Sequence, residues 1–163
     1  MTVTVAQMRD RPRLTPVYLV DILLQGAGAP TLYFSDRNIT VGSQIYENYL
    51  AELSGLAEEI ERATSRGLNP DISLKFNNDK YKTHNYLIEI GDTYPWEGAV
   101  CTIKEAYLDD SGAYTVNETL FKGALDEPSD IDLMSFNCSV SSMVFAKDQQ
   151  WSQLLITKVL YPN

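Results

Sequence analysis

The chain has 163 residues, of which 44% are hydrophobic and 21% charged, and its formal net charge is −9 with a pI near 4.5. That length suits a single domain with a core of its own, while the excess of negative charge argues against binding to nucleic-acid phosphates or to anionic membrane surfaces. No run approaches the roughly 20 apolar residues of a membrane-spanning helix and no apolar signal segment opens the chain, so we expect synthesis in the cytosol and no membrane insertion.

The first 14 residues differ in charge from the rest of the chain. They contain Arg9, Arg11 and Arg13 against one acid, Asp10, so this segment carries +2 and the remaining residues carry −11, which together give −9. A basic segment on an acidic body can dock on another copy of the chain or on a partner, although chain ends are also commonly loose. We treat this segment as an extended basic arm and its three arginines as candidate interface residues.

Apolar runs separated by turn residues follow the arm. VYLVDILLQG at 17–26 is closed by a glycine- and alanine-rich turn and followed by TLYF at 31–34, which predicts a hairpin with a loop of about four residues. A polar turn leads to ITV at 39–41, and a Gly-Ser pair then turns the chain back into QIYENYL at 44–50. We therefore expect a meander of four short strands.

The segment 50–66, LAELSGLAEEIERATSR, is ambiguous between helix and strand. Its leucines and isoleucine recur every three or four residues, and its glutamates, alanines and arginines favour helix. Gly55 interrupts this pattern, and no clean N-cap residue precedes it. Local propensity alone favours an amphipathic helix here.

Strand patterns resume beyond the turn GLNPD. ISLKF at 72–76 alternates between apolar and polar residues, and YLIEI at 86–90 has the composition of another strand. AVCTIKEAYL at 99–108 and YTVNETLFKGAL at 114–125 flank DDSG, whose aspartates and glycine favour a tight turn, so we expect a long hairpin. IDLMSFNCSV at 131–140 alternates again and predicts a further strand.

About nine extended segments are predicted, at intervals of roughly 8–15 residues, and such spacing is typical of an antiparallel β-sandwich or barrel. The tail, 149–163, fits a final strand or a short helix followed by a strand. A parallel α/β fold would need regularly alternating helices, and at most one or two short helices are expected. We therefore predict a mainly β fold, with 1–14 as an arm and 15–163 as one β-rich domain.

Residue types that carry catalysis or bind metals are sparse. His84 is the only histidine and lies in a polar stretch, so neither a nucleophile–base pair nor a zinc site is indicated. Cys101 and Cys138 lie in apolar patterns and are interpreted as small buried side chains, with a single bridge between them as the alternative. The acids at 109–110 and 126–132 lack the spacing of a calcium loop and are interpreted as solvated turns. We predict no enzyme activity, cofactor, metal or small-molecule substrate.

The aromatic residues offer a second functional hypothesis. The chain has ten tyrosines and two tryptophans, and Tyr94, Trp96 or Trp151 could stack on sugar rings in a carbohydrate-binding β-sandwich module. That hypothesis predicts a monomer with coplanar aromatic rings on one face. The aromatic residues are spread along all the predicted strands, however, and packing within sheets accounts for most of them.

Several segments taken together resemble one family of bacteriophage proteins. The stretch TLYFSDRNITVGSQIYENYL resembles the opening of phage tail-tip proteins, in which a strand ending in a polar turn leads to the element formed here by Ile39, Thr40, Gly42 and Tyr46. Later landmarks keep the same order; they are SLKFNND (73–79), GAVCTIKEAYLDDSG (98–112), LFKGALDEP (120–128) and the closing Tyr161-Pro162. The resemblance spans roughly residues 15–163 and rests on the order of these landmarks.

That family comprises structural proteins of the distal tail and the tail or baseplate hub in siphophage-like phages, phage-derived injection machines and gene transfer agents. The resemblance implies a β-rich subunit without catalytic residues, which forms a ring with its own copies and joins the tail tube to the hub or tip. The partners would be other tail or baseplate proteins, and the location would be the virion tail after synthesis in a bacterial host.

The resemblance also bears on two open points. It implies an extended segment over 50–62, which we prefer to the helix because tertiary strand pairing often overrides local propensity. Longer relatives continue beyond the closing motif, so the sequence fits a whole subunit as well as the first domain of one.

Overall fold

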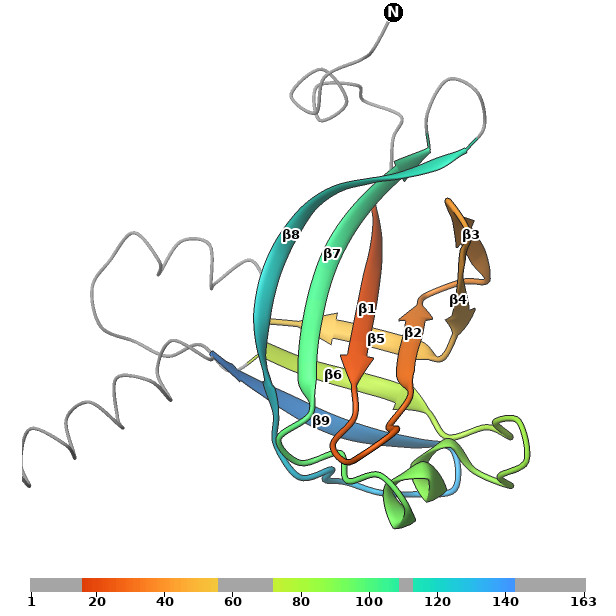
Figure 1. The fold of residues 1–163 in the computed structure, drawn as a ribbon, viewed down its shortest axis with the longest axis vertical. Helices are drawn as coiled ribbons and strands as arrows, with labels where there is room; N and C mark the ends of the chain where they lie inside the picture. The colour runs from red at the N-terminus through yellow and green to blue at the C-terminus, as the bar shows by residue number, and fades with distance from the viewer. Residues whose placement is uncertain (1–15, 56–71, 109–112, 143–163) are drawn as a thin grey trace, which may run out of the picture.

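The computed structural model describes residues 16–55, 72–108 and 113–142, which contain nine strands and one short 3-10 helix (Figure 1). The elements are β1 (Val17–Leu23), β2 (Thr31–Ser35), β3 (Ile39–Val41), β4 (Gln44–Asn48), β5 (Leu50–Ser54), β6 (Ile72–Asn77), η1 (Leu87–Asp92), β7 (Val100–Leu108), β8 (Tyr114–Leu125) and β9 (Ser135–Ser142). The predicted mainly β fold is therefore confirmed. No helix among these residues is long and apolar enough to cross a membrane.

All nine strands belong to one sheet, in the order β3-β4-β2-β1-β7-β8-β9-β6-β5. Most neighbours are antiparallel, and an additional parallel pairing of Val41 with Tyr114 joins β3 to β8. This pairing closes six of the strands into a barrel, and β9, β6 and β5 extend from the end of β8. Figure 1 shows these three strands running across the direction of β1 and β2.

β1 is buried on both faces, which explains its nearly continuous apolar sequence. Val20 and Ile22 face the larger core, and Val17 and Leu19 face a smaller one beneath β3 and β4. Side chains alternate between the faces of a strand, so one strand contributes to both cores. The larger core joins β1, β2 and β7 to the crossing strands; its largest fully buried side chains include Phe34, Leu74, Phe76, Ile103, Leu125 and Phe136.

Residues 17–48 form four short strands as expected, but their arrangement is not the expected meander, because β2 lies beside β4, in parallel, and not beside β3. The loop of the β1–β2 hairpin has seven residues, 24–30, where about four were expected. β1 pairs with β2 from Leu23 opposite Thr31, and β3 pairs with β4 across a two-residue turn that brings Val41 opposite Gln44. Gly42 has a φ of +61° in this turn, a conformation that costs glycine little and other residues more. The resemblance-based expectation of an extended segment at 50–62 is confirmed for Leu50–Ser54, and 56–62 lie outside the described residues.

The strand expected at 86–90 is wrong, because this segment forms the 3-10 helix η1. Leu87 and Ile90 are three residues apart and both enter the core, as the three-residue turn of a 3-10 helix allows. The segment is held by tertiary contacts: the Ile88 N–H donates to the Asn78 side chain at 3.1 Å, and the Trp96 indole donates to the Ile88 carbonyl at 3.3 Å. Periodicity cannot separate helix from strand in so short an apolar run.

The strand expected at 131–140 begins later, at Ser135. One carboxylate oxygen of Asp132 accepts the N–H groups of Met134 and Ser135 at 2.6 and 2.7 Å. A side chain that takes up backbone donors in this way favours a turn over a strand. The tail, 149–163, lies outside the described residues, and the single domain over 15–163 stays a prediction.

Candidate functional site

The candidate interface residues Arg9, Arg11 and Arg13 lie outside the described residues, so their role stays a prediction. The other residues considered for catalysis, metal binding or sugar stacking, apart from Trp151 and the acids at 109–110, lie within the described part of the chain. The described residues offer four kinds of feature to consider: buried side chains, a small polar cluster, shallow hollows and one exposed loop.

His84 lies in a turn, half-buried, where its backbone exchanges hydrogen bonds with Tyr81 at 2.8 and 3.3 Å. Within the described ranges, no three side chains of histidine, cysteine, aspartate or glutamate are grouped so that they could hold a metal ion. The backbone hydrogen bonds of His84 thus help to form this turn.

Cys101 and Cys138 are both buried, and both are free thiols. The interpretation as small buried side chains is confirmed, and the alternative of a bridge between them is wrong. Burial raises the pKa of Cys101, and it raises the pKa of Cys138 to about 12. A thiol with so high a pKa is a poor nucleophile at neutral pH, because the thiolate is the reactive form.

Trp96 is buried in the larger core, with only 3% of its surface exposed. Its ring contacts Phe136 at a centroid distance of 5.3 Å and Phe76 at 6.1 Å. Tyr94 is half-buried and packs against the same core, and Trp151 lies outside the described residues. A ring enclosed in this way cannot stack on a sugar, so the carbohydrate-binding hypothesis loses one of its three candidate residues.

Asp21, Tyr46 and Lys104 form a polar cluster at the smaller core that the sequence did not reveal. The Tyr46 hydroxyl donates to Asp21 Oδ1 at 2.9 Å, and the Lys104 ammonium pairs with Asp21 Oδ2. Burial first, and then the Asp21 carboxylate, raises the pKa of Tyr46, so the tyrosine keeps its proton. The one signal in the sequence is a carboxylate inside the apolar run VYLVDIL. The cluster pairs half-buried charges between β1, β4 and β7, which is a structural role.

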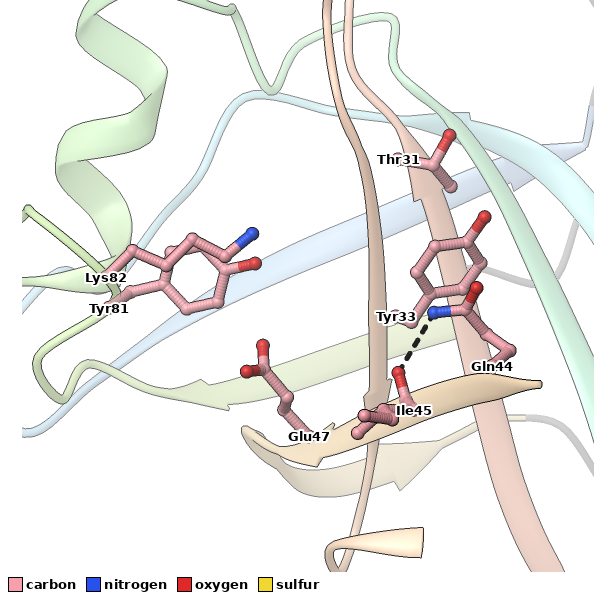
Figure 2. A pocket seen from close by; sticks show the side chains of 7 residues that line it. All are labelled: Thr31, Tyr33, Gln44, Ile45, Glu47, Tyr81 and Lys82. Atoms are coloured by element: carbon pink, nitrogen blue, oxygen red, sulfur yellow. Dashed lines mark hydrogen bonds between the residues drawn. The ribbon is translucent and has the colours of Figure 1, made fainter. Parts of the chain in front are cut away.

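A shallow hollow lies between β2, β4 and the turn that follows β6 (Figure 2). Figure 2 shows Tyr81 and Lys82 on one side of it and Tyr33, Gln44 and Thr31 on the other. Its volume is about 180 Å³, whereas small-molecule sites usually enclose roughly 300–1,000 Å³. Two further hollows measure about 190 and 280 Å³, so none of the three has the size of such a site.

The acids of the 126–132 segment lie in an exposed loop between β8 and β9. Three of their carboxylates accept hydrogen bonds from within the structure: Asp126 from Ser141, Asp130 from Asn137, and Asp132 from the backbone. These contacts agree with solvated turns. The same loop exposes Ile131, Leu133 and Met134, which the alternating sequence had assigned to a half-buried strand.

Comparison with known proteins gives a match at the level of fold. No protein-family model matches the sequence, and no curated protein matches it. Among solved structures, a chain from the virion of a native gene transfer agent (GTA) particle is similar, with a TM-score of 0.59 and 14% sequence identity. The similarity covers 89% of this chain and 46% of that one. The present chain thus spans less than half of the solved chain's length, and the identity is low enough that the comparison shows a shared fold alone.

Proposed function

We propose that this chain is a non-enzymatic structural subunit of a phage or phage-like virion. Its place would be the tail tip or baseplate, where it forms a ring and joins the tail tube to the hub or tip. The observation that carries the proposal is the fold shared with a chain of a gene transfer agent virion over 89% of the present chain. The order of sequence landmarks from residue 15 to residue 163 supports the same class of protein.

The architecture supplies what a ring subunit needs. The closed barrel gives a rigid body, and β5 lies at the end of the sheet order, where its outer side pairs with no other described strand. An open strand edge can add a strand from a neighbouring protein. In addition, the exposed loop between β8 and β9 offers apolar contact area. These features suit assembly better than binding of a small ligand.

Light scattering coupled to size-exclusion chromatography, followed by negative-stain imaging, tests the proposal on the full chain. We expect concentration-dependent self-association and ring-shaped particles, either from the chain alone or after addition of tail proteins encoded beside it. A strict monomer under both conditions, combined with saturable binding to a glycan array, would instead support the carbohydrate-binding module.

A further inference from the structure

We infer that the loop 126–134, the acidic loop, is the docking site for the basic arm 1–14 of a neighbouring copy of this chain. The inference rests on the proposed function, because it names the contact by which ring neighbours join. Such a contact requires that the loop expose apolar surface on a fixed backbone and that the arm carry the opposite charge. It also requires that loop and arm lie at different ends of the subunit.

The acidic loop exposes an unusual concentration of apolar surface. Of the large apolar side chains exposed in the described residues, three lie within four consecutive positions: Ile131 at 57%, Leu133 at 71% and Met134 at 74% exposure. Single exposed apolar residues are ordinary on protein surfaces, whereas a contiguous group commonly marks an interaction site.

This exposure does not come from a loose backbone. Asn78 is buried, and it donates its backbone N–H to the Met134 carbonyl at 2.8 Å and its side-chain amide to the Asp132 carbonyl at 2.9 Å. Asp132 in turn accepts the backbone N–H groups of Met134 and Ser135. The loop is thus held in one conformation with its apolar side chains outward, and a preformed surface loses less conformational entropy when it binds.

Charge selects the arm among the segments that lie outside the described residues. The acidic loop has four acids and no lysine or arginine, so it carries −4. By the same count, 109–112 carries −2, 56–71 carries −2, 143–163 carries +1 and the arm carries +2. The arm also has apolar side chains to place against the exposed group; they are Val3, Val5, Met8 and Leu14. Complementary charge favours encounter and fixes the orientation of such a contact.

The loop and the start of β1 lie at opposite ends of the barrel. The arm joins the described chain just before Val17, which pairs with Ala106 near the end of β7. The acidic loop follows Leu125, whose N–H donates to Ala99, just before β7 begins. Figure 1 shows these two ends far apart. Complementary surfaces at opposite ends of one subunit generate head-to-tail contacts, which can close into a ring.

A fluorescent peptide of residues 1–14 provides the direct test. It is titrated by anisotropy onto the full chain carrying Arg9→Ala, Arg11→Ala and Arg13→Ala, so that the chain's own arm competes less. We expect saturable binding that weakens about tenfold or more when Leu133→Ser and Met134→Ser are added, because central apolar anchors dominate interfaces. Binding should also weaken as salt rises from about 0.05 to 0.3 M, because salt screens exposed charges.

Ile45→Ser is the matched control, since Ile45 is an exposed apolar residue, at 62%, on β4 rather than on the loop. It should leave peptide affinity unchanged within about twofold. Absence of saturable binding, or equal weakening by Ile45→Ser and by the loop substitutions, would overturn the inference. Unchanged melting temperatures show that both variants are folded.

Mixing variants tests whether the contact joins two copies. The arm variant keeps its loop, and the loop variant keeps its arm, so together they can form one contact and no more. We expect a dimer that does not grow, whereas no new species in the mixture would contradict docking on a neighbour. If the chain is found in particles but the arm does not bind the loop, this inference fails while the virion role stands. If the arm binds the loop but the chain is absent from particles, the virion role fails while the contact between arm and loop stands.

Discussion

At the scale of single residues, the larger core is organised around aromatic rings. Phe76 is fully buried and lies 5.4 Å from Phe136, 5.6 Å from Phe34 and 6.1 Å from Trp96, between ring centroids. It therefore connects the crossing strands to β2 and to the segment after η1. The alternation of ISLKF predicted that Phe76 faces inward, but the rings that it meets come from distant parts of the sequence.

Phe76→Ala should lower the free energy of unfolding by about 3–5 kcal/mol, because it removes buried contacts and leaves a cavity. Chemical denaturation followed by tryptophan fluorescence measures the change. Tyr86→Ala, at a site that is 38% exposed, serves as the control and should cost much less. A loss below about 1 kcal/mol for Phe76→Ala would contradict the central position of this ring.

The carboxylate of Asp132 helps to hold the conformation of the acidic loop. Backbone hydrogen bonds from Ser135 and then Met134 hold the pKa of Asp132 below its ordinary value of 3.8. A carboxyl whose pKa is lowered on folding stabilises the fold fully above its unfolded value, and this contribution disappears as the pH falls through the folded value. The acidic loop should therefore keep its conformation at neutral pH and lose this support only in acid.

An NMR titration of the backbone amides of Met134 and Ser135 measures that pKa. We expect both amide signals to shift together with a midpoint below pH 3.8, and Asp132→Ala should abolish the shared transition. A midpoint at or above the ordinary value would show that the two hydrogen bonds do not form in solution.

At the scale of elements, turn chemistry accounts for what the sequence predicted well. The glycine- and aspartate-rich turns separate strands that pair with their neighbours in the chain, as in the β1–β2, β3–β4 and β7–β8 hairpins. The parallel pairing of β2 with β4 was not predicted. Prediction failed where distant contacts decide the local structure. η1 depends on Asn78 and Trp96. The loop before β9 depends on Asn78, 54 positions from Asp132, in addition to the local turn that Asp132 makes with Met134 and Ser135.

The backbones of β8 and β9 approach each other closely at Gly123. A Cβ atom at this position in β8 would lie 2.3 Å from the Ser141 carbonyl oxygen of β9, so Gly123→Ala should force the two strands apart. We expect a loss of about 1–3 kcal/mol in the free energy of unfolding, as for other overpacked sites. Lys122→Ala, at the exposed neighbouring position, should stay within about 0.5 kcal/mol in the same denaturation assay. Equal stability of the two variants would contradict the close packing of β8 and β9.

At the scale of the whole molecule, neither barrel closure nor the pairing of the half-buried charges could be predicted from the sequence. The pairing of Val41 with Tyr114 and the ion pair of Lys104 with Asp21 join residues more than 70 positions apart. Nothing in the local pattern of either segment specifies its partner. The candidate site could be predicted only in part. The charge of the basic arm is evident from the sequence, whereas the proposed docking loop was recognised from its exposed side chains and its hydrogen bonds in the structure.

The proposed virion role depends on a fold shared with one part of a gene transfer agent particle and on the order of sequence landmarks. Low identity and coverage of 46% of the solved chain make direct placement on a particle the decisive experiment. Particles purified from cells that carry this gene are labelled with gold-conjugated antibodies against the chain and imaged by electron microscopy. We expect the label at the tail end of each particle, at the distal side of the tube. Label on capsids alone, or particles that lack the chain altogether, would contradict the proposed role.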